Sequence, residues 1–281
     1  MAAIASLSLA GCASVGYYWQ SVSGHLSLLN AARPVDDWLT DAQTPEPLKA
    51  RLAMSQRIRR FAVTELKLPD NASYHRYADL RRSAVVWNVV AAPELSLTLK
   101  TWCFPVVGCV GYRGYFKELD ARAEAAQLQA QGLEVSVYGV PAYSTLGWMN
   151  WAGGDPLLST FINYPEGELA RLVFHELAHQ VAFTAGDTGF NESFATAVER
   201  TGLQRWQAST GRVGENAVQA ARRQDVRALT VRTRAELAAL YASTLPDADK
   251  RVAKARIMAT LRQAHADLKA GPWRGDTGYD A

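Results

Sequence analysis

Apolar side chains recur at helical spacing in the first part of the chain. Between Tyr17 and Leu29 they repeat every three or four positions, and Pro34 then breaks the run. A second amphipathic stretch covers residues 45–67 and stops at the turn sequence Pro-Asp-Asn of residues 69–71. The pattern therefore predicts two helices in this region.

From residue 83 to residue 141 the pattern changes to that of β-strands. Three segments are rich in β-branched and aromatic residues or alternate between apolar and polar ones: residues 84–90, 110–116 and 133–138. Residues 117–131 are rich in Ala, Glu and Leu and predict a helix between two of these strands. A further extended segment is expected over residues 142–148. These segments predict a mostly antiparallel sheet.

The second half of the chain has a predominantly helical pattern. Residues 165–207 are expected to be helical, and residues 217–241 and 246–269 form two charged amphipathic stretches. No internal repeat or low-complexity linker divides the sequence. We therefore predict an α+β protein in which residues 13–281 form a single domain. Its antiparallel sheet is followed by a helical C-terminal half.

The composition is that of a soluble globular protein. Of the 281 residues, 48% are hydrophobic and 20% are charged, and the formal net charge is +3. This positive excess is too small to indicate nucleic-acid binding. The dense basic run of residues 57–60 is interpreted as a solvated helix face. We therefore expect no nucleic-acid partner.

The first 12 residues resemble a bacterial lipoprotein signal. Residues 2–10 are small and apolar, with the length of a secretory hydrophobic region, and are too short for a bilayer span of about 20 residues. They end in Leu9-Ala10-Gly11-Cys12, which is similar to the lipobox whose cysteine becomes lipidated. We expect residues 1–12 to be the signal segment. Lipid on Cys12 would anchor the protein to the membrane of the bacterial cell envelope, facing the periplasm.

The N-terminus departs from a typical signal in one respect. No Lys or Arg precedes the apolar run, where signal peptides carry positive charge. The alternative interpretation is a buried N-terminal helix that contains an incidental cysteine.

The two remaining cysteines are consistent with export. Cys103 and Cys109 are six residues apart, with Pro105 and Gly108 between them. An even pair around a turn predicts a short-loop disulfide in an oxidising compartment. Two buried thiols are the alternative, and a metal site is less favoured because no further Cys or His lies nearby in the sequence.

The clearest chemical motif is His175-Glu176-Leu177-Ala178-His179. On a helix, residues four positions apart project from the same face, so both imidazoles can reach one metal ion. Glu176 projects in a different direction and is expected to act as a base rather than as a ligand. The helix is supported by Pro165 near its start and by acidic residues in its first turn.

A third ligand is expected from Glu192. Twelve residues separate it from His179, enough for a helix end, a Gly-containing turn at residues 185–189 and the start of an antiparallel helix. Glu192 would lie in the first turn of this second helix and face the histidines. Two histidines and one carboxylate with an open fourth position suit a catalytic zinc ion, so we predict one Zn²⁺.

The motif followed by Asn-Glu-x-Phe-Ala at residues 191–195 resembles the gluzincin metallopeptidases. Longer stretches resemble a bacterial family of putative aminopeptidases that are often lipoproteins: residues 16–20, 24–34, 100–105, 112–116 and 140–148. The similarity covers most of residues 9 to about 210. It implies a zincin-like fold with an active-site helix, a peptide substrate, metal ligands at His175, His179 and Glu192, and a base at Glu176.

The chain also differs from thermolysin-like members of this superfamily. The gap before Glu192 is shorter, and Thr196 stands four residues beyond Glu192, where an aspartate is expected. Support for a histidine ligand must then come from elsewhere, and Glu199 is a candidate, with a surface charge as the alternative. Family members are expected to continue beyond Ala281, which would leave this chain incomplete at its C-terminus.

These residues together predict hydrolysis of peptide bonds by a metal-activated water with Glu176 as general base. The resemblance implies an aminopeptidase-like enzyme of the cell envelope, although the residues themselves do not separate an aminopeptidase from an endopeptidase. Four tyrosines are available as donors to the oxyanion: Tyr112, Tyr115, Tyr143 and Tyr241. An edge strand over residues 143–148 is expected to bind the peptide backbone through Tyr143, Ser144 and Leu146, with a core strand as the alternative.

Two functions of other classes compete with this prediction. One is a non-catalytic envelope lipoprotein that binds metal or a partner. The other is a metal-free helical interaction protein that uses residues 213–270 as its partner surface.

Overall fold

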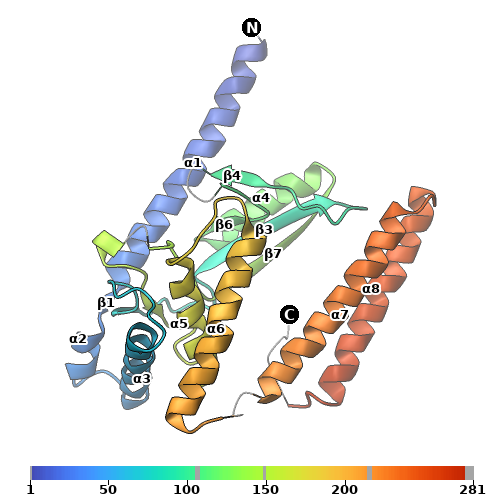
Figure 1. Cartoon of the computed structure of the whole chain (residues 1–281). Helices are drawn as coiled ribbons and strands as arrows, with labels where there is room; N and C mark the ends of the chain where they lie inside the picture. The colour runs from blue at the N-terminus through green and yellow to red at the C-terminus, as the bar shows by residue number, and fades with distance from the viewer. Residues whose placement is uncertain (1, 105–107, 148–149, 214–216, 276–281) are drawn as a thin grey trace.

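The computed structural model describes residues 2–104, 108–147, 150–213 and 217–275, with the backbone alone for residues 2–14. The fold is α+β, as predicted (Figure 1). Its helices are α1 (Ala2–Ala31), α2 (Val35–Thr40), α3 (Glu46–Thr64), α4 (Glu118–Ala130), α5 (Glu166–His179), α6 (Thr188–Thr210), α7 (Ala217–Ala242) and α8 (Asp247–Ala270). Its strands are β1 (Arg33–Pro34), β2 (Arg76–Ala78), β3 (Val86–Pro93), β4 (Trp102–Phe104), β5 (Gly108–Val110), β6 (Arg113–Tyr115), β7 (Leu133–Val140) and β8 (Leu157–Leu158).

The strands form three small sheets instead of one. The antiparallel sheet β6-β3-β7 is the largest, and its central strand pairs Val89 with Val137. Helix α4 covers one face of this sheet and buries Ala121 and Leu128 against Val89. The small sheet β1-β2-β8 contains one parallel pairing, between β2 and β8, so the sheets are mostly but not wholly antiparallel.

The strand predicted over residues 110–116 is divided between two sheets. Strand β5 pairs with β4 in a hairpin, and β6 pairs with β3 in the main sheet. The chain changes sheets at Gly111, where a β-carbon would lie 2.8 Å from the Cδ1 atom of Leu99. A larger residue at this position would require the exposed Leu99 side chain to move, and the composition of the segment does not reveal the crossing.

The main hydrophobic core lies between the helices. Leu169, Val173 and Phe174 of α5 are completely buried against α3 and α6. Of the arginines in the basic run of residues 57–60, Arg57 and Arg60 are exposed as predicted, but Arg59 of α3 is buried. Its guanidinium donates hydrogen bonds to the backbone carbonyls of Ser73 and Asn71, which explains how a cation is tolerated there.

Helix α1 begins far from the body and reaches it with its C-terminal half (Figure 1). It includes the predicted helix at Tyr17–Leu29 and continues through Cys12, whose side chain lies outside the described part of the structure. Lipidation of Cys12 therefore stays a prediction. In the part of the chain that the structure describes, no helix combines the length and apolar character needed to cross a bilayer.

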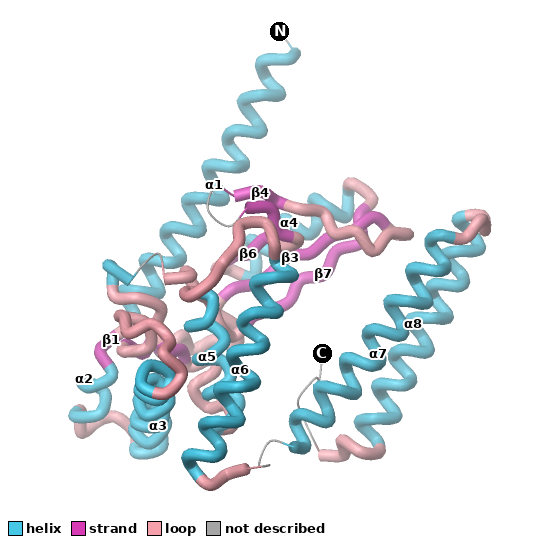
Figure 2. The backbone as a smooth tube through the Cα atoms, viewed as in Figure 1, coloured by secondary structure: helices cyan, strands magenta, loops and turns pink. Residues whose placement is uncertain are grey.

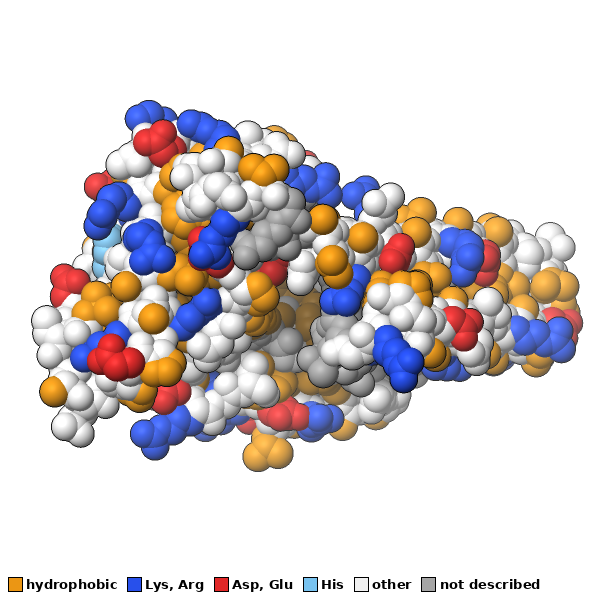
Figure 3. All heavy atoms as spheres, turned by 90° about the horizontal axis from the view of Figure 1, so that it is seen from below, with side chains coloured by type: hydrophobic (Ala, Val, Ile, Leu, Met, Phe, Trp, Pro, Cys, Tyr) orange, Lys and Arg blue, Asp and Glu red, His pale blue; other side chains and the backbone are white. Residues whose placement is uncertain are grey.

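The last two helices, α7 and α8, pack against each other as a hairpin beside the body (Figure 2). No residue of α8 is fully buried, and α7 buries only Thr233 and Leu237. Seen from below, Lys and Arg side chains are scattered over the molecule among acidic and apolar ones (Figure 3).

Candidate metal centre and substrate cleft

Helix α5 places the two histidines of the motif side by side. The helix begins after Pro165, with Glu166 and Glu168 in its first turn, where acidic side chains complement the helix dipole. One turn separates His175 from His179, and their Nε2 atoms lie 3.1 Å apart. The structure therefore brings the two imidazoles together as predicted.

Helix α6 brings Glu192 to the same point. Its carboxylate oxygens lie 3.2 Å from Nε2 of His175 and 3.8 Å from Nε2 of His179. The helix begins at Thr188, because the Asp187 carboxylate caps it by accepting a hydrogen bond from the backbone N–H of Phe190. Glu192 consequently lies in the second turn of α6, one turn further along than predicted.

Asn191, directly before Glu192, fixes the position of α6 relative to the end of α5. Its side chain is 4% exposed, accepts a hydrogen bond from the backbone N–H of Thr184 and donates one to the carbonyl of the same residue. This pair of bonds ties the start of α6 to the loop that follows His179. Asn191 is thus a positioning residue for Glu192, a role that the sequence did not reveal.

The spacing of the three side chains fits a tetrahedral metal ion. Metal-to-ligand bonds of about 2.0–2.1 Å at tetrahedral angles place neighbouring ligand atoms about 3.3 Å apart. The two Nε2 atoms are 3.1 Å apart, one oxygen of Glu192 lies 3.2 Å from His175 and its other oxygen 3.8 Å from His179. One donor atom from each residue lies within 4.8 Å of the other two. These residues can therefore hold one ion and leave a side open to the cleft.

A buried carboxylate supports the first histidine. Nδ1 of His175 lies 3.0 Å from Oε2 of Glu199, whose residue is 7% exposed. The other oxygen of Glu199 accepts a hydrogen bond from Arg171. With Nδ1 bonded to the carboxylate, Nε2 faces the centre, which is the arrangement typical of a metal-bound histidine. The candidate role predicted for Glu199 matches this geometry, and the surface-charge alternative does not.

The ligand set has a strongly negative environment. Burial lowers the pKa of His175, but hydrogen bonds to Glu192 and Glu199 outweigh this effect and raise it to about 10. The hydrogen bond from His175 lowers the pKa of Glu192. The carboxylates around His175 thus favour positive charge at this point, which is consistent with a centre that binds a cation.

Glu176 stands beside this centre in a less polar environment. Burial raises the pKa of its carboxyl group to about 7, although the charge of His175 opposes the shift. Ser144 contributes a hydrogen bond that acts in the lowering direction. A carboxyl group with a pKa near neutrality is suited to exchange protons with a reacting water.

The loop that faces Glu176 is fixed by a buried aspartate. Asp155, 1% exposed, accepts hydrogen bonds from the hydroxyls of Ser144 and Thr145 at 3.1 and 2.8 Å and from the backbone N–H of Thr145 at 3.0 Å. The chain then bends at Leu146 and Gly147, which have φ values of 55° and 80°. Asp155 is a second positioning residue that the sequence did not single out.

This bend contradicts the edge strand predicted over residues 143–148. The described residues 142–147 form an irregular loop and a turn. The apolar character of the segment was mistaken for a strand signal, because the hydrogen bonds that shape it come from Asp155, ten residues away from Thr145. Trp148, the last residue of the prediction, lies outside the described residues.

The metal centre opens into a cleft of about 690 Å³. The three residues predicted to bind substrate, Tyr143, Ser144 and Leu146, all line it. Two of the four candidate oxyanion donors, Tyr112 and Tyr143, are also in its wall. Tyr115 is instead buried beneath α4, and Tyr241 lies on α7 beside Lys254.

Helix α1 supplies part of the cleft that the sequence did not predict. Tyr17, Tyr18 and Ser21 line it, more than 150 residues before the metal motif. The Gln20 side chain ties the helix to strand β6 by donating to the carbonyl of Gly114 and accepting from the N–H of Phe116. The only signal for the two tyrosines is their aromatic character, which is equally typical of core packing.

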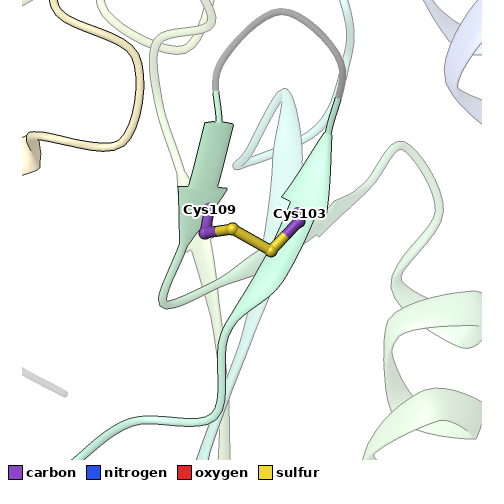
Figure 4. The surroundings of a disulfide bond; sticks show 2 residues. All are labelled: Cys103 and Cys109. Carbon is purple, nitrogen blue, oxygen red and sulfur yellow. A yellow bond between two sulfur atoms is a disulfide. The ribbon is translucent and has the colours of Figure 1, made fainter.

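A disulfide closes the β4–β5 hairpin at the rim of the cleft. Cys103 and Cys109 are directly opposite in the two strands and are joined as predicted (Figure 4). Phe104 and Val110, one residue beyond each cysteine, line the cleft. The crosslink therefore restricts how far Phe104 and Val110 can move relative to each other in the cleft wall.

Comparisons with known proteins give one match. The family described as "Putative aminopeptidase" matches residues 16–281. A search of curated proteins and a search of solved structures each returned no match.

Proposed function

This chain belongs to the putative aminopeptidase family, and on that premise we propose that it is a zinc-dependent peptidase. The observation that carries the proposal is the convergence of His175, His179 and Glu192 at tetrahedral spacing, with Glu176 beside them in the same cleft. We propose a zincin-like, gluzincin-type fold for the same reason, since the two histidines lie on one helix and the glutamate on the next.

A bound zinc ion would polarise both a water molecule and the carbonyl group of the substrate. The Glu176 carboxylate accepts a proton from the water, whose oxygen forms a bond to the carbonyl carbon. The same carboxyl group then returns the proton to the amide nitrogen as the carbon–nitrogen bond breaks. Burial raises the pKa of the Glu176 carboxyl group, and this favours its taking part in both proton transfers.

The negative charge that develops on the carbonyl oxygen requires a hydrogen-bond donor. Tyr112 is the best placed of the candidates, because it lines the cleft and its phenol lies within the electrostatic influence of Glu192 and Glu176. The ring of Tyr143 packs against those of Phe116 and His25, so we assign it a packing role. We propose Tyr112 as the donor.

The proposed location is the bacterial cell envelope, with the protein anchored by lipid on Cys12. The Leu-Ala-Gly-Cys sequence at residues 9–12 supports the anchor. The Cys103–Cys109 disulfide supports an oxidising compartment such as the periplasm.

The test is the conservative variant Glu176→Gln. Wild type purified with zinc should bind one zinc ion per chain by elemental analysis and cleave a peptide library, read by mass spectrometry. Glu176→Gln should keep its zinc and its circular dichroism spectrum but cleave about 10²- to 10⁴-fold more slowly. Equal cleavage by the two proteins would exclude Glu176 as the base. Absence of cleavage in both, with zinc bound, would favour a non-catalytic metal-binding lipoprotein.

A further inference from the structure

We infer that the cleft binds an internal, apolar segment of a peptide, and that the enzyme cleaves within chains instead of removing residues from a free N-terminus. This inference rests on the proposed function and specifies its substrate. Two independent features of the cleft carry it: the side chains of its wall and the charges it contains.

Aromatic side chains from several separate segments form much of the wall. Tyr17 and Tyr18 come from α1, Phe104 and Tyr112 from the β4–β6 region, and Phe183 from the loop after α5. These rings provide large apolar faces, and they meet around the metal centre although they are far apart in the sequence. Such a surface recognises large apolar or aromatic side chains by area burial and ring contacts.

The described residues of the cleft offer no spare negative charge for an α-ammonium group. Among the described residues that line it, the only carboxylates are those of Glu176 and Glu192. The first is the proposed base, and the second is held by the histidines of the metal centre. A free amino terminus would therefore find no unengaged carboxylate among the described residues of the wall, and burying a charge without an ionic partner is unfavourable.

The size of the cleft is also consistent with an extended segment. Its volume of about 690 Å³ lies within the range of roughly 300–1,000 Å³ that is typical of ligand sites. Its wall takes residues from elements far apart in the chain, from Tyr18 of α1 to Phe183 beyond the motif helix. We infer that these residues offer room for more than one side chain of a bound peptide.

The first experiment uses one apolar ten-residue peptide with a central Phe, prepared with a free and with an acetylated N-terminus. The zinc-loaded full chain should cleave both at the same internal bond, with kcat/KM values within about twofold. Replacing the central Phe by Asp should lower kcat/KM at least tenfold. Cleavage of the free peptide alone, from its first residue, would overturn the inference while leaving the zinc peptidase intact. No cleavage of any peptide would defeat the proposed function itself.

The second experiment measures binding without turnover. The zinc-loaded Glu176→Gln protein binds the acetylated peptide, and Tyr18→Ala in that background should weaken the Kd by roughly 2- to 10-fold, measured by calorimetry. Trp19→Ala is the matched control, because Trp19 is the next residue of the same helix, is 73% exposed and does not line the cleft. Equal effects of the two substitutions, or none from Tyr18→Ala, would overturn the assignment of the aromatic wall.

Discussion

The chain contains two pairs of neighbouring helices, α5–α6 and α7–α8, that differ in how they are held. Eight of the fourteen residues of α5 are buried, whereas α8 has no buried residue. The first pair shares the main core, and side chains from both of its helices form the candidate metal centre. The second pair contacts the body through ion pairs such as those of Arg251 with Glu94 and Lys254 with Glu134.

This difference indicates that α5–α6 is the more rigid of the two helix pairs. A metal site requires its ligands to stay within a few tenths of an ångström of their positions, and close packing provides this. Exposed ion pairs contribute little to stability because water screens them. We therefore interpret α5–α6 as the rigid frame of the chemistry and α7–α8 as an accessory element that can vary without disturbing it.

The largest expected effect is on the free energy of unfolding, which should depend on α5 much more than on α7. Phe174→Ala removes a completely buried ring that packs against Phe61, and it should lower the free energy of unfolding by about 3–5 kcal/mol. Val231→Ala on α7, where the side chain is 59% exposed, should change it by less than about 0.5 kcal/mol. Urea unfolding followed by circular dichroism measures both. Similar losses would show that the hairpin is as tightly packed as the frame.

The next effect concerns the support of the metal centre. Glu199→Gln removes the charge that bonds to Nδ1 of His175 and should weaken zinc binding about 10- to 100-fold. The control is Glu236→Gln on α7, where the carboxylate is 4.0 Å from Arg232 at the surface. Competition with a fluorescent zinc chelator gives the two affinities. If Glu199→Gln leaves the affinity unchanged, the carboxylate has a structural role only.

The sequence predicted the α+β class and most helices, because their patterns are local. It also indicated the three residues that the structure brings together as a candidate metal centre, since a helix fixes the spacing of His175 and His179 and the short gap limits where Glu192 can lie. The disulfide followed from the turn between its cysteines, and the structure contains it.

What the sequence did not predict depends on contacts between distant segments. The loop at Ser144 was taken for a strand because its shape comes from hydrogen bonds to Asp155. Tyr18 could not be assigned to the cleft, since the position of α1 depends on bonds to β6 that no local pattern encodes. Arg59 was assigned to a solvated face, although the carbonyl groups that satisfy it follow it by more than ten residues.

The smallest expected effect examines the connection between the two helix pairs. Arg223 of α7 donates to Glu168 at 2.7 Å, Glu168 lies 3.1 Å from Arg171, and Arg171 pairs with Glu199 behind His175. This chain of charges links the accessory hairpin to the metal centre. Because both ends of the first link are partly exposed, Arg223→Ala should cost less than about 1 kcal/mol of stability.

The same variant tests whether the chain of ion pairs also affects zinc affinity. If the hairpin is accessory, Arg223→Ala should leave zinc affinity within about twofold of wild type. At about 1 M salt the Debye length is only about 3 Å, so the difference in stability between Arg223→Ala and wild type should disappear. A fall in zinc affinity comparable to that of Glu199→Gln would show that the hairpin is not merely accessory. The hairpin would then help to orient His175 through Glu168, Arg171 and Glu199. The two helix pairs would in that case form one functional unit, because ion pairs as well as close packing would hold the ligands in position.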